Sequence, residues 1–147
     1  MIIRQALLRD SIAIHRLLTQ LGYPPQNDAF IVSKIESYST EGYHLLVGDM
    51  DNETVGFISL HWFDIFHSTA KMGRITALCV SEHVRGEGVG RQLLEAAEKF
   101  MILKGCSKVE VTSNVKRTLT HEFYLKNGYT EDSRRFVKAL SVENLEG

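Results

Sequence analysis

A glycine-rich turn between a strand-like run and an amphipathic helix is the feature that most constrains the fold of this chain. Residues 71–80 are typical of a strand, residues 85–90 have the sequence Arg-Gly-Glu-Gly-Val-Gly, and residues 88–104 carry apolar side chains at helical spacing. Three glycines allow a tight turn and let a ligand approach the backbone without meeting a Cβ atom. A strand, a tight turn and a helix in this order indicate a protein of α/β type.

The same glycine turn has the features of an anion-binding site. Free backbone N–H groups at the helix start and the helix dipole favour negative charge, and Arg85 and Arg91 add positive charge. Position 91 is arginine where a dinucleotide-binding turn has its third glycine. No Lys-Ser or Lys-Thr pair follows, as a P-loop requires. The turn therefore predicts a phosphate or pyrophosphate site of another kind, and a turn without a ligand is the alternative.

Hydrophobic periodicity and turn residues divide the chain into short elements. Asp10 or Ser11 is expected to cap the first helix, because a short side-chain oxygen accepts from free backbone N–H groups. One domain over residues 1–147 with the order β-α-α-β-β-β-α-β-α-β predicts the α/β class (mixed α+β), with a central mixed, mostly antiparallel sheet flanked by helices. A further short strand near Tyr129 is left open. We expect helices over residues 11–21, 28–38, 88–104 and 119–127, and strands over residues 1–5, 43–49, 54–63, 71–80, 108–112 and 135–140.

Composition excludes several classes of protein. The net charge of -1 argues against a nucleic-acid partner, and no apolar stretch is long enough to predict a membrane partner. The first residues lack a signal-peptide pattern, so a cytoplasmic location is expected. Cys79 and Cys106 have no metal-ligand spacing and are interpreted as buried thiols of a reducing compartment. A homodimer is the default expectation for the oligomeric state.

Two motifs in the second half of the chain resemble those of the GNAT superfamily of N-acetyltransferases. Arg85-x-x-Gly88-x-Gly90 matches the superfamily's acetyl-CoA motif, and it stands after the strand and before the helix, as expected. About 40 residues later, Phe-Tyr-Leu-Lys-Asn-Gly-Tyr over residues 123–129 is similar to its Phe-Tyr-x-x-x-Gly-Phe/Tyr segment. The two motifs in this order are more specific than either one alone.

The resemblance implies a GNAT-like fold, in which a parallel pair of strands splays apart at the acetyl-CoA site. Acetyl-CoA would be the co-substrate, with its pantetheine arm on backbone groups of the strand and its pyrophosphate on the amides of residues 85–90. Tyr124 would lie near the coenzyme sulfur as the general acid. The resemblance assigns the coenzyme to Leu78, Val80, Arg85, Gly86, Gly88, Val89, Gly90 and Arg91, and more distantly to Asn114, since Arg117 and Thr120 stand where many members have Asn-x-x-Ala.

The acceptor amine and the general base are less well defined. Many members carry a base on the strand before the glycine turn, where this chain has Thr76 and Ala77, so His61, His67 and Asp64 remain alternatives. Their spacing matches no strong metal pattern, and no metal is predicted. The segments 112–117, 121–125 and 135–140 resemble aminoalkylphosphonate N-acetyltransferases, which implies a small primary amine with an anionic group. The candidate acceptor residues are His61, His67, Arg74, Thr76 and Arg117.

The predicted mechanism is direct attack of the amine on the thioester, with Tyr124 protonating the departing thiolate. A packing role for Tyr124 is the alternative. At 100° per residue, Phe123 is expected to stay in the core and Tyr124 to point out of it. Other functions stay open: acetylation of a protein N-terminus, a lysine or an aminoglycoside, or a non-catalytic acyl-CoA sensor. Solvated surface charge is the alternative role for Arg74 and Arg117, which could otherwise grip a phosphonate.

Overall fold

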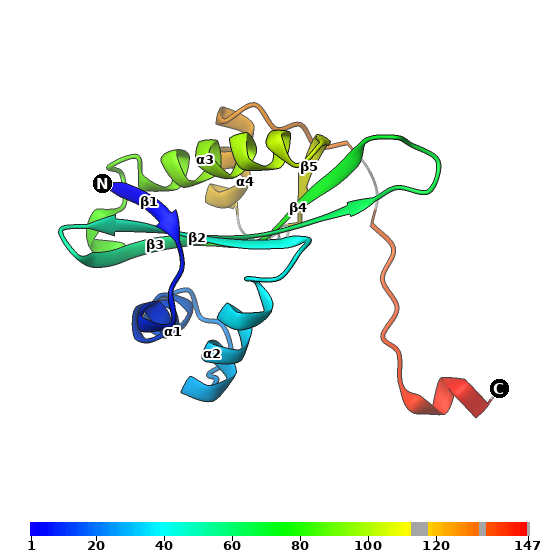
Figure 1. Cartoon of the computed structure of the whole chain (residues 1–147), viewed down its shortest axis with the longest axis horizontal. Coiled ribbons are helices and arrows are strands. Elements are labelled where there is room, and N and C mark those ends of the chain that lie inside the picture. Colours follow the sequence, from blue (N-terminus) through cyan, green and yellow to red (C-terminus); the bar gives the residue numbers. More distant parts are fainter. Residues whose placement is uncertain (113–117, 133–134, 147) are drawn as a thin grey trace. The chain divides into compact units, whose positions relative to one another are not determined.

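The structure, a computed structural model, describes residues 1–112, 118–132 and 135–146, and the chain divides into two compact units, residues 1–112 and 113–147 (Figure 1). Asn114 and Arg117 lie outside the described residues. The single-domain interpretation stays a prediction. The elements of the first unit are β1 (Ile2–Gln5), α1 (Ser11–Gln20), α2 (Asp28–Ser37), β2 (Tyr43–Met50), β3 (Glu53–Asp64), β4 (Lys71–Val80), α3 (Val89–Leu103) and β5 (Cys106–Val111), with 3-10 turns at Leu8–Asp10 and Glu82–Val84; the second unit has α4 (Thr118–Lys126) and a 3-10 turn at Val142–Glu146.

The first unit is one five-stranded sheet in the order β1-β2-β3-β4-β5. The first four strands are antiparallel to their neighbours, and β5 runs parallel to β4. Helices α1 and α2 cover one face of the sheet and α3 covers the other (Figure 1). The predicted class, a mixed and mostly antiparallel sheet flanked by helices, is confirmed. Within the described ranges, no helix is long and apolar enough to cross a membrane.

Each face of the sheet has its own apolar layer. Under α3, Leu93, Ala97 and Met101 are fully buried. The sequence predicts Val89, Leu93, Ala97 and Phe100 for the inner face of that helix; the first three are buried and Phe100 is partly buried. Phe100 stacks on His44 with ring centroids 3.9 Å apart, and burial of His44 lowers its pKa, with Lys104 adding to the effect. Under α1 and α2, the cluster of buried residues consists of Ala6, Ile14, Leu17, Ile31, Ile35, Leu45, Val47, Phe57 and Cys79.

The two cysteines differ in environment. Cys79 is buried in the α1–α2 layer, as predicted, whereas Cys106 at the start of β5 is only partly buried. The prediction of two buried thiols is therefore wrong for Cys106, because β5 is the last strand in the sheet order and its first residue follows the Gly105 turn at the end of α3. Partial burial raises the pKa of the Cys106 thiol, and Lys71 opposes this effect.

Asp10 does not cap α1 with its side chain, which corrects the sequence prediction. Its carboxylate is 3% exposed and instead accepts hydrogen bonds from the Arg4 guanidinium, from the Leu7 N–H at 2.7 Å and from the Thr54 hydroxyl at 2.7 Å. Burial alone would raise the pKa of Asp10, but these hydrogen bonds outweigh it and lower the pKa from 3.8 to about 2. The ion pair with Arg4 on β1 therefore holds the Asp10 carboxylate in a buried position, away from the N–H groups of α1.

Replacing Asp10 with asparagine is expected to destabilise the fold by about 2–3 kcal/mol at pH 7, because it removes the buried carboxylate that pairs with the Arg4 guanidinium. The folded-state pKa lies below the unfolded one, so this stability is present above about pH 4 and disappears as the pH falls toward about 2. Urea unfolding at pH 7 and at pH 3 measures both effects. The matched control is Asp28→Asn, whose carboxylate is 80% exposed; an equal loss in the two variants would contradict the assignment.

The C-terminal strand predicted over residues 135–140 is wrong. Residues 135–140 and 129–132 contain no strand in the described structure, so the optional strand near Tyr129 is absent there as well. Alternating apolar residues make a segment suitable for a sheet, but a strand exists only where a second strand pairs with its backbone. The sequence shows the alternation of apolar residues, but it does not show whether a second strand lies beside the segment.

Candidate active site

The glycine turn is open on the side where side chains would project. Gly86 and Gly88 both have φ +83°, a left-handed conformation that glycine adopts without strain. A Cβ atom at Gly86 would meet nothing within 4 Å, and one at Gly88 would come no closer than 3.7 Å to Arg91. The turn therefore leaves its backbone accessible to a ligand.

The backbone N–H groups of the turn fall into two sets. The N–H of Arg85 donates to the Glu82 carbonyl and that of Glu87 to the Val84 carbonyl, so both are used within the turn. Among the described residues, no acceptor is found for five other N–H groups, which lie at or just before the start of α3, where the helix dipole is positive. These five donors, which suit a pyrophosphate, belong to Gly86, Gly88, Val89, Gly90 and Arg91.

This set refines the predicted one. Arg85 was expected to contribute its amide, but that amide is occupied, and only its exposed guanidinium is available to an anion. Arg91 adds an amide that the sequence prediction had not counted, and its side chain lies 3.6 Å from Glu95. The amides without an acceptor thus extend one residue further into α3 than the predicted range of residues 85–90.

Strands β4 and β5 stop pairing half-way along β4. Their ladder ends at Ile75 opposite Val111, so β5 does not accompany residues 76–80. At this point β4 carries a bulge: Ser59 pairs with Ala77 and Leu60 with Ile75, which leaves Thr76 as the extra residue. A bulge bends and twists its strand. The predicted coenzyme residues Leu78 and Val80 follow the bulge and pair with β3.

A row of side chains crosses the sheet on the face that carries α2. Tyr43 on β2 lies opposite His61 on β3, which lies opposite Arg74 on β4, which lies opposite Glu110 on β5. The rings of Tyr43 and His61 stack with centroids 4.5 Å apart. Thr76 borders this row, because its hydroxyl lies 3.0 Å from the hydroxyl of Tyr38 and 2.7 Å from that of Ser59.

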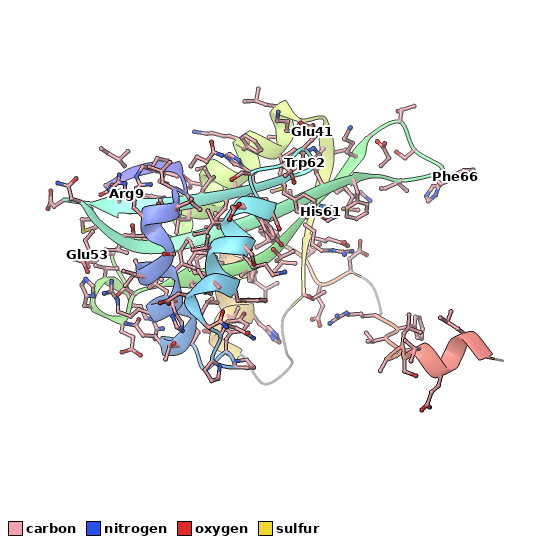
Figure 2. The ribbon with its side chains drawn as sticks, turned by 60° about the horizontal axis from the view of Figure 1, so that its bottom comes forward. Arg9, Glu41, Glu53, His61, Trp62 and Phe66 are labelled. Carbon is pink, nitrogen blue, oxygen red and sulfur yellow. The ribbon has the colours of Figure 1, made fainter. Side chains whose placement is uncertain are left out.

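The structure therefore brings together three of the five predicted acceptor residues: His61, Arg74 and Thr76. His67 lies in the exposed loop between β3 and β4, whose neighbouring Phe66 projects far from His61 (Figure 2). Arg117 lies outside the described residues. In the described ranges, no three His, Cys, Asp or Glu side chains form a metal site.

Arg74 has a defined orientation. Its Nε donates to Oε1 of Glu110 at 2.8 Å, its Nη2 contacts the same oxygen, and the guanidinium lies 5.1 Å above the centre of the Phe63 ring. Nη1 donates to no acceptor in the described part of the chain. The pair thus presents one guanidinium edge that can still receive an anion.

Tyr124 lies on α4 of the second unit and is 8% exposed. Its ring packs edge-on against Phe123 at 5.2 Å and against Tyr129 at 5.3 Å. Phe123 is half-buried, so the predicted arrangement of these two residues is reversed. After α4 the chain turns at Gly128, where the Tyr129 N–H donates to the Tyr124 carbonyl and the Tyr129 ring packs edge-on against that of Tyr124.

The sequence profile of the acetyltransferase (GNAT) family matches residues 12–129. The chain belongs to the GNAT family. It is 32% identical over 94% of its length to an aminoalkylphosphonate N-acetyltransferase of Salmonella typhimurium, covering 90% of that protein. An aminoglycoside N(6′)-acetyltransferase of Stenotrophomonas maltophilia is 29% identical, with 96% and 94% of the two chains covered. An aminoglycoside N-acetyltransferase solved in complex with CoA has the same fold, with a TM-score of 0.83 and 19% identity over 95% of this chain and 93% of its own.

The protein is therefore an acyltransferase, and the GNAT fold accounts for the glycine turn and the parting strands. Sequence reasoning missed four residues of this acetyltransferase that belong to the row of side chains across the sheet or border it. A signal existed for Tyr43 and Glu110, since both stand in predicted strands, but only the strand register brings them beside His61 and Arg74. The four missed residues are Tyr38, Tyr43, Ser59 and Glu110.

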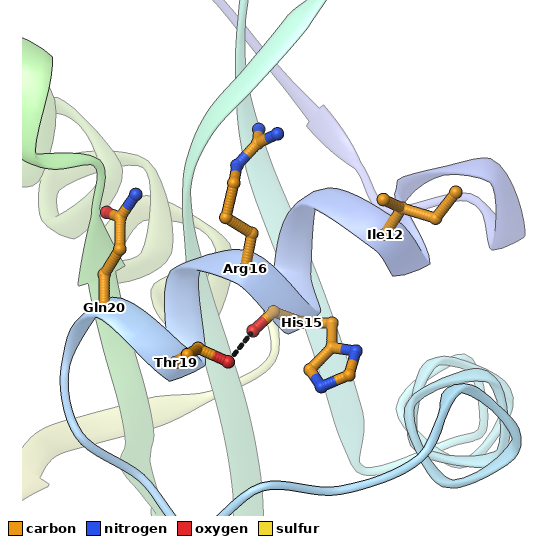
Figure 3. A pocket seen from close by; sticks show the side chains of 5 residues that line it. All are labelled: Ile12, His15, Arg16, Thr19 and Gln20. Carbon is orange, nitrogen blue, oxygen red and sulfur yellow. Dashed lines mark hydrogen bonds between the residues drawn. The ribbon is translucent and has the colours of Figure 1, made fainter.

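A separate shallow hollow lies on the outer face of α1 of the acetyltransferase (Figure 3). Its side chains are engaged in local contacts: the Thr19 hydroxyl donates to the His15 carbonyl at 3.0 Å, and Nδ1 of His15 lies 3.2 Å from Asp28. Gln20 accepts the Glu82 N–H at 3.3 Å and so ties α1 to the turn before the glycines. We assign the hollow no part in the chemistry. It is lined by Ile12, His15, Arg16, Thr19 and Gln20.

Proposed function

We propose that this acetyltransferase transfers an acetyl group from acetyl-CoA to a small primary amine that carries an anionic group, with aminoalkylphosphonates as the first acceptors to test. The observation that carries the coenzyme assignment is the set of five N–H donors without an acceptor among the described residues at the start of α3, beside a turn open to a ligand. The similarity to the Salmonella aminoalkylphosphonate enzyme over 94% of the chain supports the acceptor class.

The residues of the first unit suit the coenzyme in two places. The amides of Gly86, Gly88, Val89, Gly90 and Arg91 would hold its pyrophosphate, and the side chains of Arg85 and Arg91 would add charge. The β4 backbone at Leu78 and Val80, beyond the point where β5 departs, would bond the pantetheine arm. When bound, acetyl-CoA supplies an activated acetyl thioester. We propose Asn114 as a further contact from the family pattern.

Two groups of the chain would serve the chemical step. A β4 backbone N–H such as that of Val80 would donate to the carbonyl oxygen as it gains negative charge. The Tyr124 hydroxyl would give its proton to the departing sulfur. Both roles follow from the family pattern together with the positions of these residues in the strand and in α4.

Arg74 is the proposed anion contact for the acceptor. Its Nε and Nη2 are held by Glu110, so the guanidinium is already oriented when an acceptor arrives, and Nη1 is the edge left for a phosphonate. Because Glu110 already pairs with Arg74, it is not available to a second cation, and the pair offers one anion contact at Nη1. This arrangement suits a small acceptor that carries one anionic group. Arg117, which we propose as a second cation, follows the family pattern alone.

Aminoglycoside acetylation is the second candidate, favoured by the 29% identity to the Stenotrophomonas enzyme. A polycation would need a cleft lined by acidic residues. On the sheet face, the one carboxylate of the cross-strand row, Glu110, is neutralised by Arg74. This local balance favours the acceptor that carries an anionic group.

Removal of the Arg74 charge should separate the two acceptor classes. We expect Arg74→Gln to raise KM for 2-aminoethylphosphonate about tenfold, the value of one charge-assisted hydrogen bond, and to change KM for an uncharged alkylamine less than about twofold. Initial rates with both amines and with an aminoglycoside measure this. Arg9→Gln, an exposed arginine on the turn before α1, is the matched control. Wild-type enzyme that acetylates the aminoglycoside or the uncharged amine faster than the phosphonate would overturn the acceptor assignment.

A further inference from the structure

We propose that Nε2 of His61 accepts the proton that the acceptor amine loses, because the Gly42 carbonyl holds the imidazole in the tautomer that leaves a lone pair on Nε2. The proposal rests on the proposed function and adds the general base that the family motifs leave unassigned. Three features carry it: the hydrogen bond of Nδ1, the rings that pack beside the imidazole, and its place beside the point where β4 leaves β5.

The hydrogen bond of His61 fixes its tautomer. Nδ1 lies 3.0 Å from the carbonyl oxygen of Gly42. A carbonyl oxygen can only accept, so Nδ1 must carry the hydrogen. A neutral imidazole with its hydrogen on Nδ1 has an unprotonated Nε2, which is the atom able to take a proton. Gly42, in the turn before β2, thus sets both the orientation and the chemistry of a residue on β3.

Two aromatic rings pack beside the imidazole of His61. Tyr43 stacks on it with centroids 4.5 Å apart and an interplanar angle of 20°, and Phe63 follows at 5.3 Å and 27°. The Nδ1 edge faces Gly42. His61 is half-buried, and among the described residues its Nε2 has no hydrogen-bond partner.

The position of His61 places it beside the bulge at which β4 parts from β5. His61 and Ser59 project from the same face of β3, about 7 Å apart along the strand. Ser59 contacts Thr76, the bulged residue at which β4 parts from β5. The titratable and charged groups around His61 are the hydroxyls of Tyr43 from β2 and Tyr38 from α2, and the Arg74–Glu110 pair from β4 and β5.

The two alternative bases, Asp64 and His67, are both exposed. Asp64 is 83% exposed and lies 3.7 Å from Lys71, so its carboxylate is in solvent. His67 is exposed in the loop after β3. Of the three candidates that the sequence left open, His61 alone has a fixed tautomer and ordered neighbours.

The proton balance of the reaction is simple. The acceptor arrives as an ammonium ion and must lose two protons as its nitrogen forms the amide bond and the thioester C–S bond breaks. One of them passes through Nε2 of His61 to water, which leaves the imidazole neutral for the next turnover. The other replaces the proton that Tyr124, the proposed donor, gives to the departing sulfur, so that the phenol is restored. No oxidant, reductant or metal is needed.

The test compares pH profiles of the wild type and His61→Gln. Glutamine can still donate to the Gly42 carbonyl through its amide, but it cannot titrate. We expect kcat to fall about 100-fold. The rise of kcat/KM across the pH range near neutrality in which imidazoles titrate should disappear, while acetyl-CoA affinity and thermal stability stay unchanged. His15→Gln on the outer face of α1 is the matched control and should keep the wild-type profile.

The outcomes separate the proposals. If the wild type acetylates an amine and His61→Gln keeps both the ascending limb and a kcat within about threefold of wild type, the assignment of His61 is wrong and the proposed function stands. If the wild type acetylates none of the amines, the proposed function fails and the base assignment fails with it. Should His61→Gln unfold, His61→Asn is measured under the same criteria.

Discussion

Tyr124→Phe is expected to lower kcat by one to three orders of magnitude, the usual contribution of a general acid. The variant removes one hydroxyl and keeps the ring that packs against Phe123 and Tyr129. Since only the departing thiolate would feel the loss, KM for acetyl-CoA should change little. Steady-state rates with 2-aminoethylphosphonate and thermal unfolding of both proteins measure these effects.

The control for Tyr124 is Tyr23→Phe, which removes a hydroxyl from a tyrosine after α1. It should keep wild-type kcat. Because Tyr124 is buried, a purely structural role predicts a different pattern: a lower melting temperature together with wild-type kcat in the folded variant. That result would assign Tyr124 a packing role, and water would then be the donor of the proton that the sulfur gains.

Much of the first unit could be predicted because its sequence signals are local. The strand over residues 71–80 has the bounds observed for β4. The turn between β2 and β3 falls at Asp51 and Asn52, inside the predicted turn, and both residues adopt the positive φ that such two-residue turns require. Gly105 ends α3 at φ +92°, as a C-terminal glycine should.

The row of side chains from Tyr43 to Glu110 across the sheet could not be predicted because a bulge decides it. Counting back from the turn at residues 51–52 places Tyr43 opposite Leu60. A bulge between Gly48 and Asp49 shifts the register by one, so Tyr43 meets His61 instead. A shift of one residue exchanges the two faces of a strand, and no sequence signal marks this bulge. The same holds for the bulge at Thr76, which sets where β4 and β5 part.

Other differences from the sequence predictions have a tertiary cause. The buried Asp10 follows from its contacts with Arg4 and Thr54, which are distant from the cap that the local pattern indicated. The reversed burial of Phe123 and Tyr124 accompanies the turn after α4. Helical spacing gives the angle between two side chains but not the side on which the core lies.

Gly88→Asp is expected to lower the affinity for acetyl-CoA at least 100-fold, which corresponds to about 2.7 kcal/mol. The backbone has room for the new side chain, since a Cβ atom there comes no closer than 3.7 Å to another residue. Its carboxylate, however, would accept from the same free N–H groups that are proposed to hold the pyrophosphate. It would also repel the negative charge of the coenzyme.

The matched control is Gly22→Asp. Gly22 has φ +79° and open space around its Cβ position, so this variant carries the same added charge and similar backbone strain at the end of α1. Any loss of affinity seen in Gly88→Asp and absent in Gly22→Asp therefore reports on the glycine turn, once both proteins are shown to be folded.

The most direct measurement of the central claim is calorimetric titration of these three proteins with acetyl-CoA. The account predicts one site per chain in the wild type, the same site in Gly22→Asp, and at least a 100-fold weaker one in folded Gly88→Asp. Absence of binding to the wild type, or equal affinity of the wild type and Gly88→Asp, would contradict the assignment of the coenzyme to the glycine turn.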